Sequence, residues 1–150
     1  MTKSTFEYDY LYRDPYLHKL TNHLMKDGKK SVAERIISNT LFEIKKMTNL
    51  DPILVFHTAI ENVKPSVQVK TLRVAGSTYQ VPIEISSEKQ LFYAVQWILH
   101  SSRARKERSM FLKLAFEILD AFKNKGAAVE KKETVHKMAE ANRAFVYYRW

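Results

Sequence analysis

Residues 63–85, VKPSVQVKTLRVAGSTYQVPIEI, decide the fold of this chain. Apolar and polar residues alternate over 67–70 and again over 79–85, a pattern typical of half-buried β-strands. The residues between them at 75–78, Ala-Gly-Ser-Thr, are small and include a glycine, which favours a tight turn. The sequence therefore predicts a β-hairpin over residues 67–85.

The same stretch predicts how the hairpin sits on the rest of the protein. The alternation slips near Thr71 and Leu72, which indicates a bulge or a strong twist there. Pro82 has no N–H to donate, so it is tolerated only on an edge. A ribbon of only two strands is marginal in water, and its base is therefore expected to pack on helices. The apolar side chains available for that packing are Val67, Val69, Ile83 and Ile85.

Composition limits the classes of function. The chain has 150 residues, 45% of them hydrophobic, which predicts a single globular domain. A net charge of +9 and a pI of about 9.7 point to an anionic partner such as RNA, DNA or an anionic membrane. Because there is no cysteine, disulfides, thiolate zinc sites and cysteine nucleophiles are excluded. No apolar run approaches the length of about 18 residues that a transmembrane helix needs, and the N-terminus shows neither a secretory nor a transit signal.

Residues 1–13 are predicted to form an aromatic arm ahead of a single helical domain at 14–150. Side chains at alternate positions of an extended chain share one side, so the arm would present its rings together: Phe6, Tyr8, Tyr10 and Tyr12. Such rings stack on bases or lie in an apolar groove of a partner. The acidic Glu7 and Asp9 between them favour a partner protein or self-packing over nucleic acid.

Three helices are expected before the hairpin. Asp14-Pro15 and Asp51-Pro52 each place an N-cap aspartate before a proline, so they start the first and third helices. Asp27-Gly28 is expected to end the first helix, Pro65 stops the third, and the second spans 31 to about 47. The predicted core stripes are Leu17, Leu20, Leu24 and Met25; Val32, Ala33, Ile36, Ile37, Leu41 and Ile44; and Leu54, Val55, Ala59 and Val63.

Three more helices are expected after the hairpin. Ser87 with Gln90 matches a capping box at the start of the fourth helix. The fifth runs from about Ser109 to Lys125-Gly126, and the sixth runs toward the C-terminus. The predicted fold class is mainly α, a six-helix bundle with a protruding two-stranded β-hairpin between the third and fourth helices.

The sequence predicts no enzyme. His18 and His23 are five residues apart, which does not place two ligands on one helix face. No zinc-protease, phosphate-loop, dinucleotide-binding or nucleophile-elbow motif occurs. Asp14, Asp27 and Asp51 are better explained as caps or turn residues. We therefore expect no catalytic residue, no metal site and no cofactor.

The basic residues, by contrast, favour a nucleic-acid partner. Those singled out lie in the connections between helices or on the hairpin, not on the apolar stripes: Lys29, Lys30, Lys70, Arg73, Arg103, Arg105, Lys106 and Arg108. A single charge run is usually a solvated surface, but several that converge beside a ribbon favour nucleic acid. We expect that replacing Arg103 and Arg105 by alanine weakens RNA binding and leaves stability nearly unchanged. Composition does not choose RNA over DNA, and an architectural DNA-binding protein with a β-ribbon arm is the alternative.

Several long motifs resolve the choice between RNA and DNA. The runs MKDGKKSVAERI, ENVKPSVQVK, LRVAGSTYQVPIEI, AVQWIL and KGAAVEKKETVHKMAEANRAFVYYRW occur in that order. Together they resemble ribosomal protein seven of the small subunit over residues 14–150. The resemblance implies a six-helix body with a protruding hairpin that binds small-subunit rRNA and nucleates assembly of the head in the 3′ major domain. It also implies a place near the exit-site tRNA and mRNA path, beside ribosomal protein eleven of the small subunit.

The resemblance also implies individual binding residues. Arg143 and Arg149 join the eight basic residues above as rRNA contacts, and the tip residues Gly76, Ser77 and Thr78 approach the exit-site tRNA. Gly76 has a physical reason to be glycine, because a tight turn needs a positive φ or a close backbone approach. The arm departs from the arginine-rich arm of bacterial members, and Leu72 stands where they commonly carry a basic residue. Together with 17 lysines against 8 arginines, these departures indicate an organelle-encoded, mitochondrial member, with a plastid or an AT-rich bacterium as alternatives.

Overall fold

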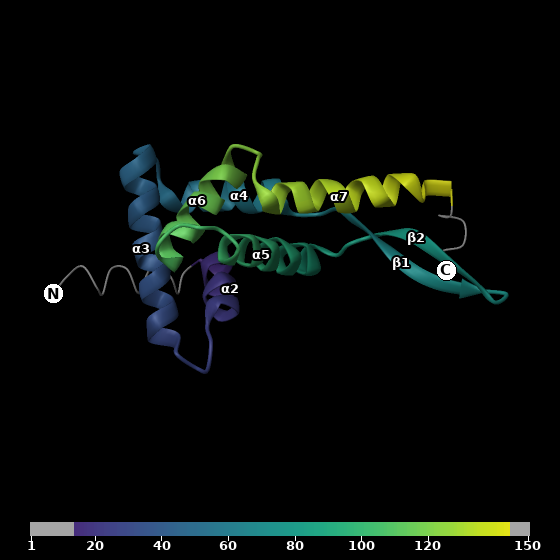
Figure 1. The fold of residues 1–150 in the computed structure, drawn as a ribbon, viewed down its shortest axis with the longest axis horizontal. Helices are drawn as coiled ribbons and strands as arrows, with labels where there is room; N and C mark the ends of the chain where they lie inside the picture. The colour runs from purple at the N-terminus through teal and green to yellow at the C-terminus, as the bar shows by residue number, and fades with distance from the viewer. Residues whose placement is uncertain (1–13, 145–150) are drawn as a thin grey trace.

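A computed structural model describes residues 14–144 and shows a helical body from which a hairpin projects (Figure 1). The elements follow in the order α2 (Pro15–Leu24), α3 (Lys30–Thr48), α4 (Pro52–Val63), β1 (Val67–Val74), β2 (Ser77–Glu84), α5 (Ser87–Arg103), α6 (Met110–Phe122) and α7 (Ala127–Ala141). Over the described residues this confirms the predicted six helices and the hairpin between the third and fourth of them. The aromatic arm and Arg149 lie outside the described residues.

Helix α6 is the centre of the core. It packs against α3, α4 and α5 and buries Leu114, Ala115 and Ile118. Helix α4 supplies Phe56, which is fully buried. Burying one large apolar side chain contributes about 1.5–3 kcal/mol, so this shared core is what keeps the helix ends, and the charged connections between them, in fixed positions.

The two Asp-Pro pairs start their helices as predicted. The Asp14 carboxylate accepts hydrogen bonds from the backbone N–H groups of Tyr16 (2.9 Å) and Leu17 (3.2 Å). The Asp51 carboxylate accepts from the N–H of Ile53 at 3.1 Å. Each bond satisfies an N–H that has no partner inside its own helix.

Three predicted helix boundaries are wrong. Helix α2 ends at Leu24, and Asp27-Gly28 instead forms a left-handed turn (φ 55° and 72°) before α3. Helix α6 ends at Phe122 in a local cap: Asn124 is left-handed (φ 59°), and its N–H donates to the Ala121 carbonyl at 2.9 Å. The Asn62 side chain also donates to the Ala121 and Phe122 carbonyls, at 2.9 Å and 3.2 Å.

The third error concerns the start of α5. Its N-cap residue is Ser86, whose side chain makes no capping bond, so the predicted capping box of Ser87 and Gln90 is absent. The Gln90 amide instead donates to the Ile85 carbonyl at 2.9 Å. A single-residue shift in the N-cap position is enough to break the spacing that a capping box requires.

Two residues of the predicted core stripes face outward. Leu54 is 61% exposed and Val32 is 37% exposed. On α4 the buried residues are Val55, Phe56, Ala59, Ile60 and Val63, and Leu54 lies one position off that stripe. The exposure of Val32 on α3 bears on the site described below.

The hairpin register is continuous, from Val67↔Glu84 at the base to Val74↔Ser77 at the tip. The register therefore rules out a bulge near Thr71 and Leu72, one of the two alternatives that the slipped alternation predicted. The outer hairpin projects beyond the helices (Figure 1), so burial does not enforce alternation there. The turn is only two residues long, Ala75 (φ 52°) and Gly76 (φ 82°), which is the geometry that matches the twist of a hairpin.

The register explains why Pro82 is tolerated. The pair that flanks a two-residue turn is hydrogen-bonded, and bonded and non-bonded pairs then alternate along the ladder. This counting makes Val69↔Pro82 a non-bonded pair, so the missing N–H of Pro82 would point away from β1. The bond from the Ile85 N–H to the Ser66 carbonyl, at 3.0 Å, agrees with the same alternation.

The base of the hairpin belongs to the helical body. Ile85 is buried, while Val67, Val69 and Ile83 are half-buried. Directly opposed residues share a face, so the valines lie on one face of the ribbon and Ile83 on the other. Helix α7 packs along both strands, and the Ser66 N–H donates to His136 Nε2 at 3.1 Å.

Candidate nucleic-acid interface

Two parts of the chain that are far apart in the sequence meet at a hollow of about 290 Å³ in the helical body. One is the α2–α3 connection, and the other is the end of α5 with the start of α6, on either side of the α5–α6 connection. The lining residues are Leu24, Met25, Lys26, Lys29, Val32, Ala33, Ile36, Arg103 and Met110. The fold thus brings together two predicted site residues, Lys29 and Arg103. It adds Lys26, which the sequence did not single out although it lies in the same MKDGKK run.

The other basic residues predicted in and beside these connections do not line the hollow. Arg103 and Met110 line it and bracket the loop that carries Lys106 and Arg108, both exposed. Lys30 is the first residue of α3 and is half-buried. Arg103 lies in the last turn of α5, where the negative end of the helix dipole favours a cation.

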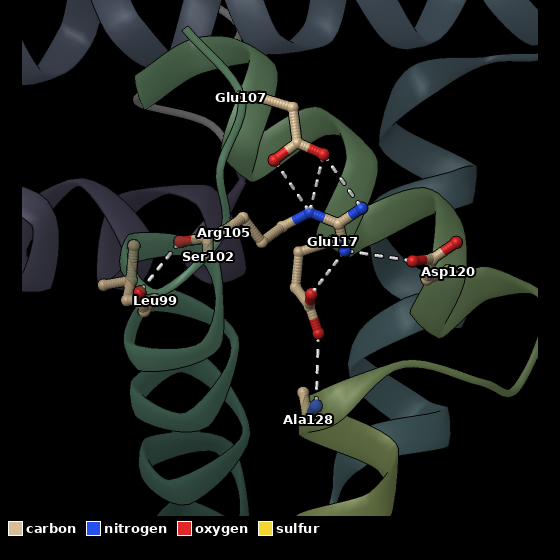
Figure 2. A network of polar contacts seen from close by, with 7 residues as sticks. All are labelled: Leu99, Ser102, Arg105, Glu107, Glu117, Asp120 and Ala128. Atoms are coloured by element: carbon tan, nitrogen blue, oxygen red, sulfur yellow. Dashed lines mark hydrogen bonds and ion pairs between the residues drawn. The ribbon is translucent and has the colours of Figure 1, made fainter. Parts of the chain in front are cut away.

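Arg105 differs from its neighbours because it turns inward (Figure 2). Its Nε donates to Glu107 Oε1 at 3.1 Å, and its Nη1 donates to Glu117 Oε2 at 2.9 Å and to Asp120 Oδ2 at 3.0 Å. Burial disfavours the charged guanidinium, but these three carboxylates outweigh it and raise the pKa of Arg105 above its usual range. The structure therefore contradicts the basis of the expectation that replacing Arg105 leaves stability unchanged.

Glu117 links this cluster to α7. Its side chain is 1% exposed, and its second oxygen, Oε1, accepts a hydrogen bond from the N–H of Ala128 at 3.1 Å. Ala128 lies in the first turn of α7, whose N-cap residue Gly126 has no side chain to do this. One buried carboxylate thus caps α7 and holds the basic loop through Arg105 (Figure 2).

The hairpin cations are separate from this site. Lys70 and Arg73 are exposed on β1, and because they are three residues apart they lie on opposite faces of the ribbon. The hairpin projects at one end of the molecule, away from the α2–α3 connection (Figure 1). The predicted basic residues of the connections and the hairpin therefore form two groups. The body group is Lys29, Lys30, Arg103, Lys106 and Arg108, and the ribbon group is Lys70 and Arg73.

Arg143 lies near the base of the hairpin. It lines a hollow of about 450 Å³ between α7 and the strands, together with Val67, Pro82 and His136. Its guanidinium is 3.1 Å from Glu140 in an exposed ion pair, which contributes little to stability and leaves the side chain accessible.

Three of the five histidines make contacts within the fold. His57 Nε2 is 2.6 Å from Asp14 Oδ2, and the His23 ring packs edge-on against Phe92. Burial, and secondarily Lys132, lowers the pKa of His136, which keeps its ring neutral and able to accept the Ser66 N–H. Within residues 14–144 there is no cluster of acidic, histidine and cysteine side chains that could hold a metal. No helix in the same range is long and apolar enough to cross a membrane.

A helical body with basic connections and a projecting basic ribbon defines a class of proteins built to contact nucleic acid. The chain matches the family described as Ribosomal protein S7p/S5e over residues 1–143. It is 51% identical over 140 residues to small ribosomal subunit protein uS7m of Reclinomonas americana, covering 93% of this chain and 88% of that protein. It is 53% identical over 134 residues to uS7 of Wigglesworthia glossinidia brevipalpis, covering 89% and 86%.

The chain belongs to the ribosomal protein S7 family of the small ribosomal subunit. A third relative, uS7 of Acidiphilium cryptum, is 50% identical over 139 residues, covering 91% of this chain and 88% of that protein. The family is structural and not enzymatic, which confirms that expectation and removes the architectural DNA-binding alternative. The family match begins at residue 1, so it also includes the aromatic arm, which the sequence motifs did not cover.

Proposed function

We propose that this protein binds the 3′ major domain of small-subunit rRNA as a primary binder and nucleates assembly of the head. The observation that carries the proposal is the convergence of Lys26 and Lys29, from the α2–α3 connection, with Arg103, from the end of α5, at one hollow. These cations sit on packed helix ends. Binding to phosphates therefore does not have to pay the entropy cost of ordering a flexible loop.

The proposed rRNA contacts keep all but one of the basic residues that the sequence singled out. They are Lys29, Lys30, Arg103, Lys106 and Arg108 on the body and Lys70 and Arg73 on the ribbon, with Arg143 and Arg149 as further contacts. Arg105 is proposed to act by holding the loop that presents Lys106 and Arg108, because three carboxylates already surround its guanidinium.

We further propose that the hairpin tip, Gly76 to Thr78, approaches the exit-site tRNA and mRNA, beside ribosomal protein eleven. In support, the tip is exposed, uncharged and remote from the body group (Figure 1). A mitochondrial location is the preferred compartment, supported by the uS7m relative. Bacterial relatives are similar to this chain at nearly the same identity, so a bacterial origin stays an alternative, as does a plastid origin. Sequencing the rRNA that co-purifies with the protein decides between them.

The test is a salt titration of binding to a 3′ major domain rRNA fragment. About five neutralised phosphates predict a loss of several hundredfold in affinity between 50 and 200 mM salt. Lys106→Ala with Arg108→Ala is expected to reduce the salt slope by about two. The charge-matched control is Lys45→Ala with Lys46→Ala, at the opposite end of α3. A flat salt profile, or equal affinity for duplex DNA of the same length, would refute the proposal.

A further inference from the structure

We propose that the hollow between the α2–α3 and α5–α6 connections holds one unstacked nucleotide of the bound RNA. Its base would lie on the apolar floor, and its phosphate would lie at the rim formed by Lys26, Lys29 and Arg103. The inference rests on the proposed rRNA binding and names the chemical group that occupies this part of the interface.

The floor of the hollow is apolar and partly open to solvent. Leu24 and Ala33 are buried, Met25, Ile36 and Met110 are half-buried, and Val32 is 37% exposed. Val32 therefore has an apolar surface that the packing of the protein core leaves open to solvent. Because methionine side chains are flexible, an apolar floor that contains them can accommodate either a purine or a pyrimidine ring.

The size of the hollow matches a base. Its volume of about 290 Å³ corresponds to roughly ten water molecules at about 30 Å³ each, and a nucleobase has about eight to eleven non-hydrogen atoms. The space therefore suffices for one base with part of its sugar.

The rim has the charge that a phosphate requires. Lys26, Lys29 and Arg103 are all exposed, and none of the lining residues is acidic. Helix α3 begins at the same rim without a side-chain cap, so its positive end also faces this region. Cations from two different parts of the chain around one apolar floor match a nucleotide, whose flat base is weakly polar and whose phosphate is anionic.

Single-stranded rRNA supplies this ligand more readily than a duplex does. Proteins read RNA mainly at loops and bulges, whose bases can splay out onto side chains. A stacked duplex offers phosphates to the rim but no base to the floor. An apolar side chain of a neighbouring protein is the competing occupant, and the experiment below distinguishes the two.

Filling the hollow tests the proposal without changing charge. Val32→Trp enlarges an already exposed side chain, and it should lower affinity for the 3′ major domain fragment roughly tenfold. The salt slope should not change, because no cation is removed, whereas Lys29→Ala should reduce that slope by about one. Leu54→Trp, at a 61% exposed position outside the hollow, is the matched control and should bind as the native protein does.

A photo-crosslink identifies the occupant directly. A small aliphatic diazirine amino acid at position 32, close to valine in size, should crosslink to one unpaired nucleotide in reconstituted small subunits, and the same group at position 54 should not. A crosslink from position 32 to a ribosomal protein, or native affinity of the Val32→Trp variant, would overturn the nucleotide pocket alone. Failure of the native protein to bind the fragment with salt dependence would instead overturn the proposed function.

Discussion

Arg105 shows how one residue can be misjudged when only its neighbours in sequence are considered. It lies between Arg103 and Lys106 in a basic run, which predicts a shared role at the surface. Two of its three carboxylate partners, Glu117 and Asp120, lie on the next helix, 12 and 15 positions later. That spacing carries no signature in the sequence, because the loop between Arg105 and α6 has no regular period.

The first prediction is that Arg105→Ala destabilises the fold, whereas Arg103→Ala does not. Removing Arg105 leaves the buried carboxylate of Glu117 without its cation, which should cost about 3 kcal/mol of unfolding free energy. Arg103 is exposed, so its replacement should stay within about 0.5 kcal/mol. Urea denaturation of both variants measures the difference, and equal unfolding free energies would show that the carboxylate cluster is not structural.

The carboxylates that surround Arg105 also restrict which residue fits at position 126. The backbone of Gly126 (φ 96°, ψ 172°) lies in a region that glycine almost alone adopts. An added Cβ would also lie 3.0 Å from the Cβ of Asp120 and 3.4 Å from Glu117 Oε1.

Gly126→Ala should therefore be more destabilising than Gly28→Ala. Gly28 also has a positive φ, of 72°, but no atom lies within 4 Å of the site of its Cβ. We expect about 1 kcal/mol for Gly28→Ala from backbone strain alone and at least about 2 kcal/mol for Gly126→Ala. Thermal denaturation at one pH compares them, and a smaller loss at Gly126 would mean that the Asp120 contact relaxes freely.

At the scale of elements, helix α7 holds the base of the hairpin through His136. The ring accepts the Ser66 N–H only when it is neutral. Burial and Lys132 lower the folded pKa of His136 below the ordinary value of 6.5. The unfolded chain therefore takes up the proton first as the pH falls.

Stability should accordingly decrease as the pH drops below about 6.5, and it should not depend on this group above that value. His136→Gln should flatten part of the decline. A remainder is expected from His23, whose pKa is also lowered by burial and by Lys19. Unfolding free energies at pH 7.5 and 5.5 measure the effect, and an unchanged pH dependence in His136→Gln would disprove this assignment.

The hairpin allows its tip and base to be separated experimentally. Removing residues 73, 74, 77 and 78 shortens both strands equally and keeps the Leu72↔Tyr79 pairing next to the Ala75-Gly76 turn. The shortened protein should fold and enter small subunits, with altered exit-site tRNA dissociation. Arg73→Ala controls for the lost charge. Loss of incorporation in the shortened protein but not in Arg73→Ala would place the tip on rRNA.

The sequence predicted the elements better than their ends. The Asp-Pro pairs fixed two helix starts because the cap and the proline act locally. The end of α6 also involves Asn62 of α4, a residue far away in the sequence. The same division holds for the site: the charges in the connections were predicted, but the hollow that joins Lys29 to Arg103 exists only once α2, α3, α5 and α6 have packed.

At the scale of the whole molecule, the predicted basic residues of the helix connections and the hairpin, all within residues 14–144, form two groups at different distances from the core. The body group sits on packed helix ends, and the ribbon group sits on a projecting hairpin (Figure 1). A rigid body supplies an interface with a fixed geometry, and a ribbon reaches a second part of the RNA. This arrangement suits a protein that binds one rRNA domain and leaves its hairpin tip near another ligand.

The absence of cysteine makes the central claim directly measurable, because one introduced cysteine is a unique attachment point for an iron chelate. Lys106→Cys places the chelate on the body group, and Lys46→Cys places it at the far end of α3. In reconstituted small subunits, hydroxyl radicals from position 106 should cleave the 3′ major domain of the rRNA strongly, and those from position 46 weakly. Strong cleavage from position 46 with none from position 106 would contradict the claim that the basic end of the helical body binds rRNA.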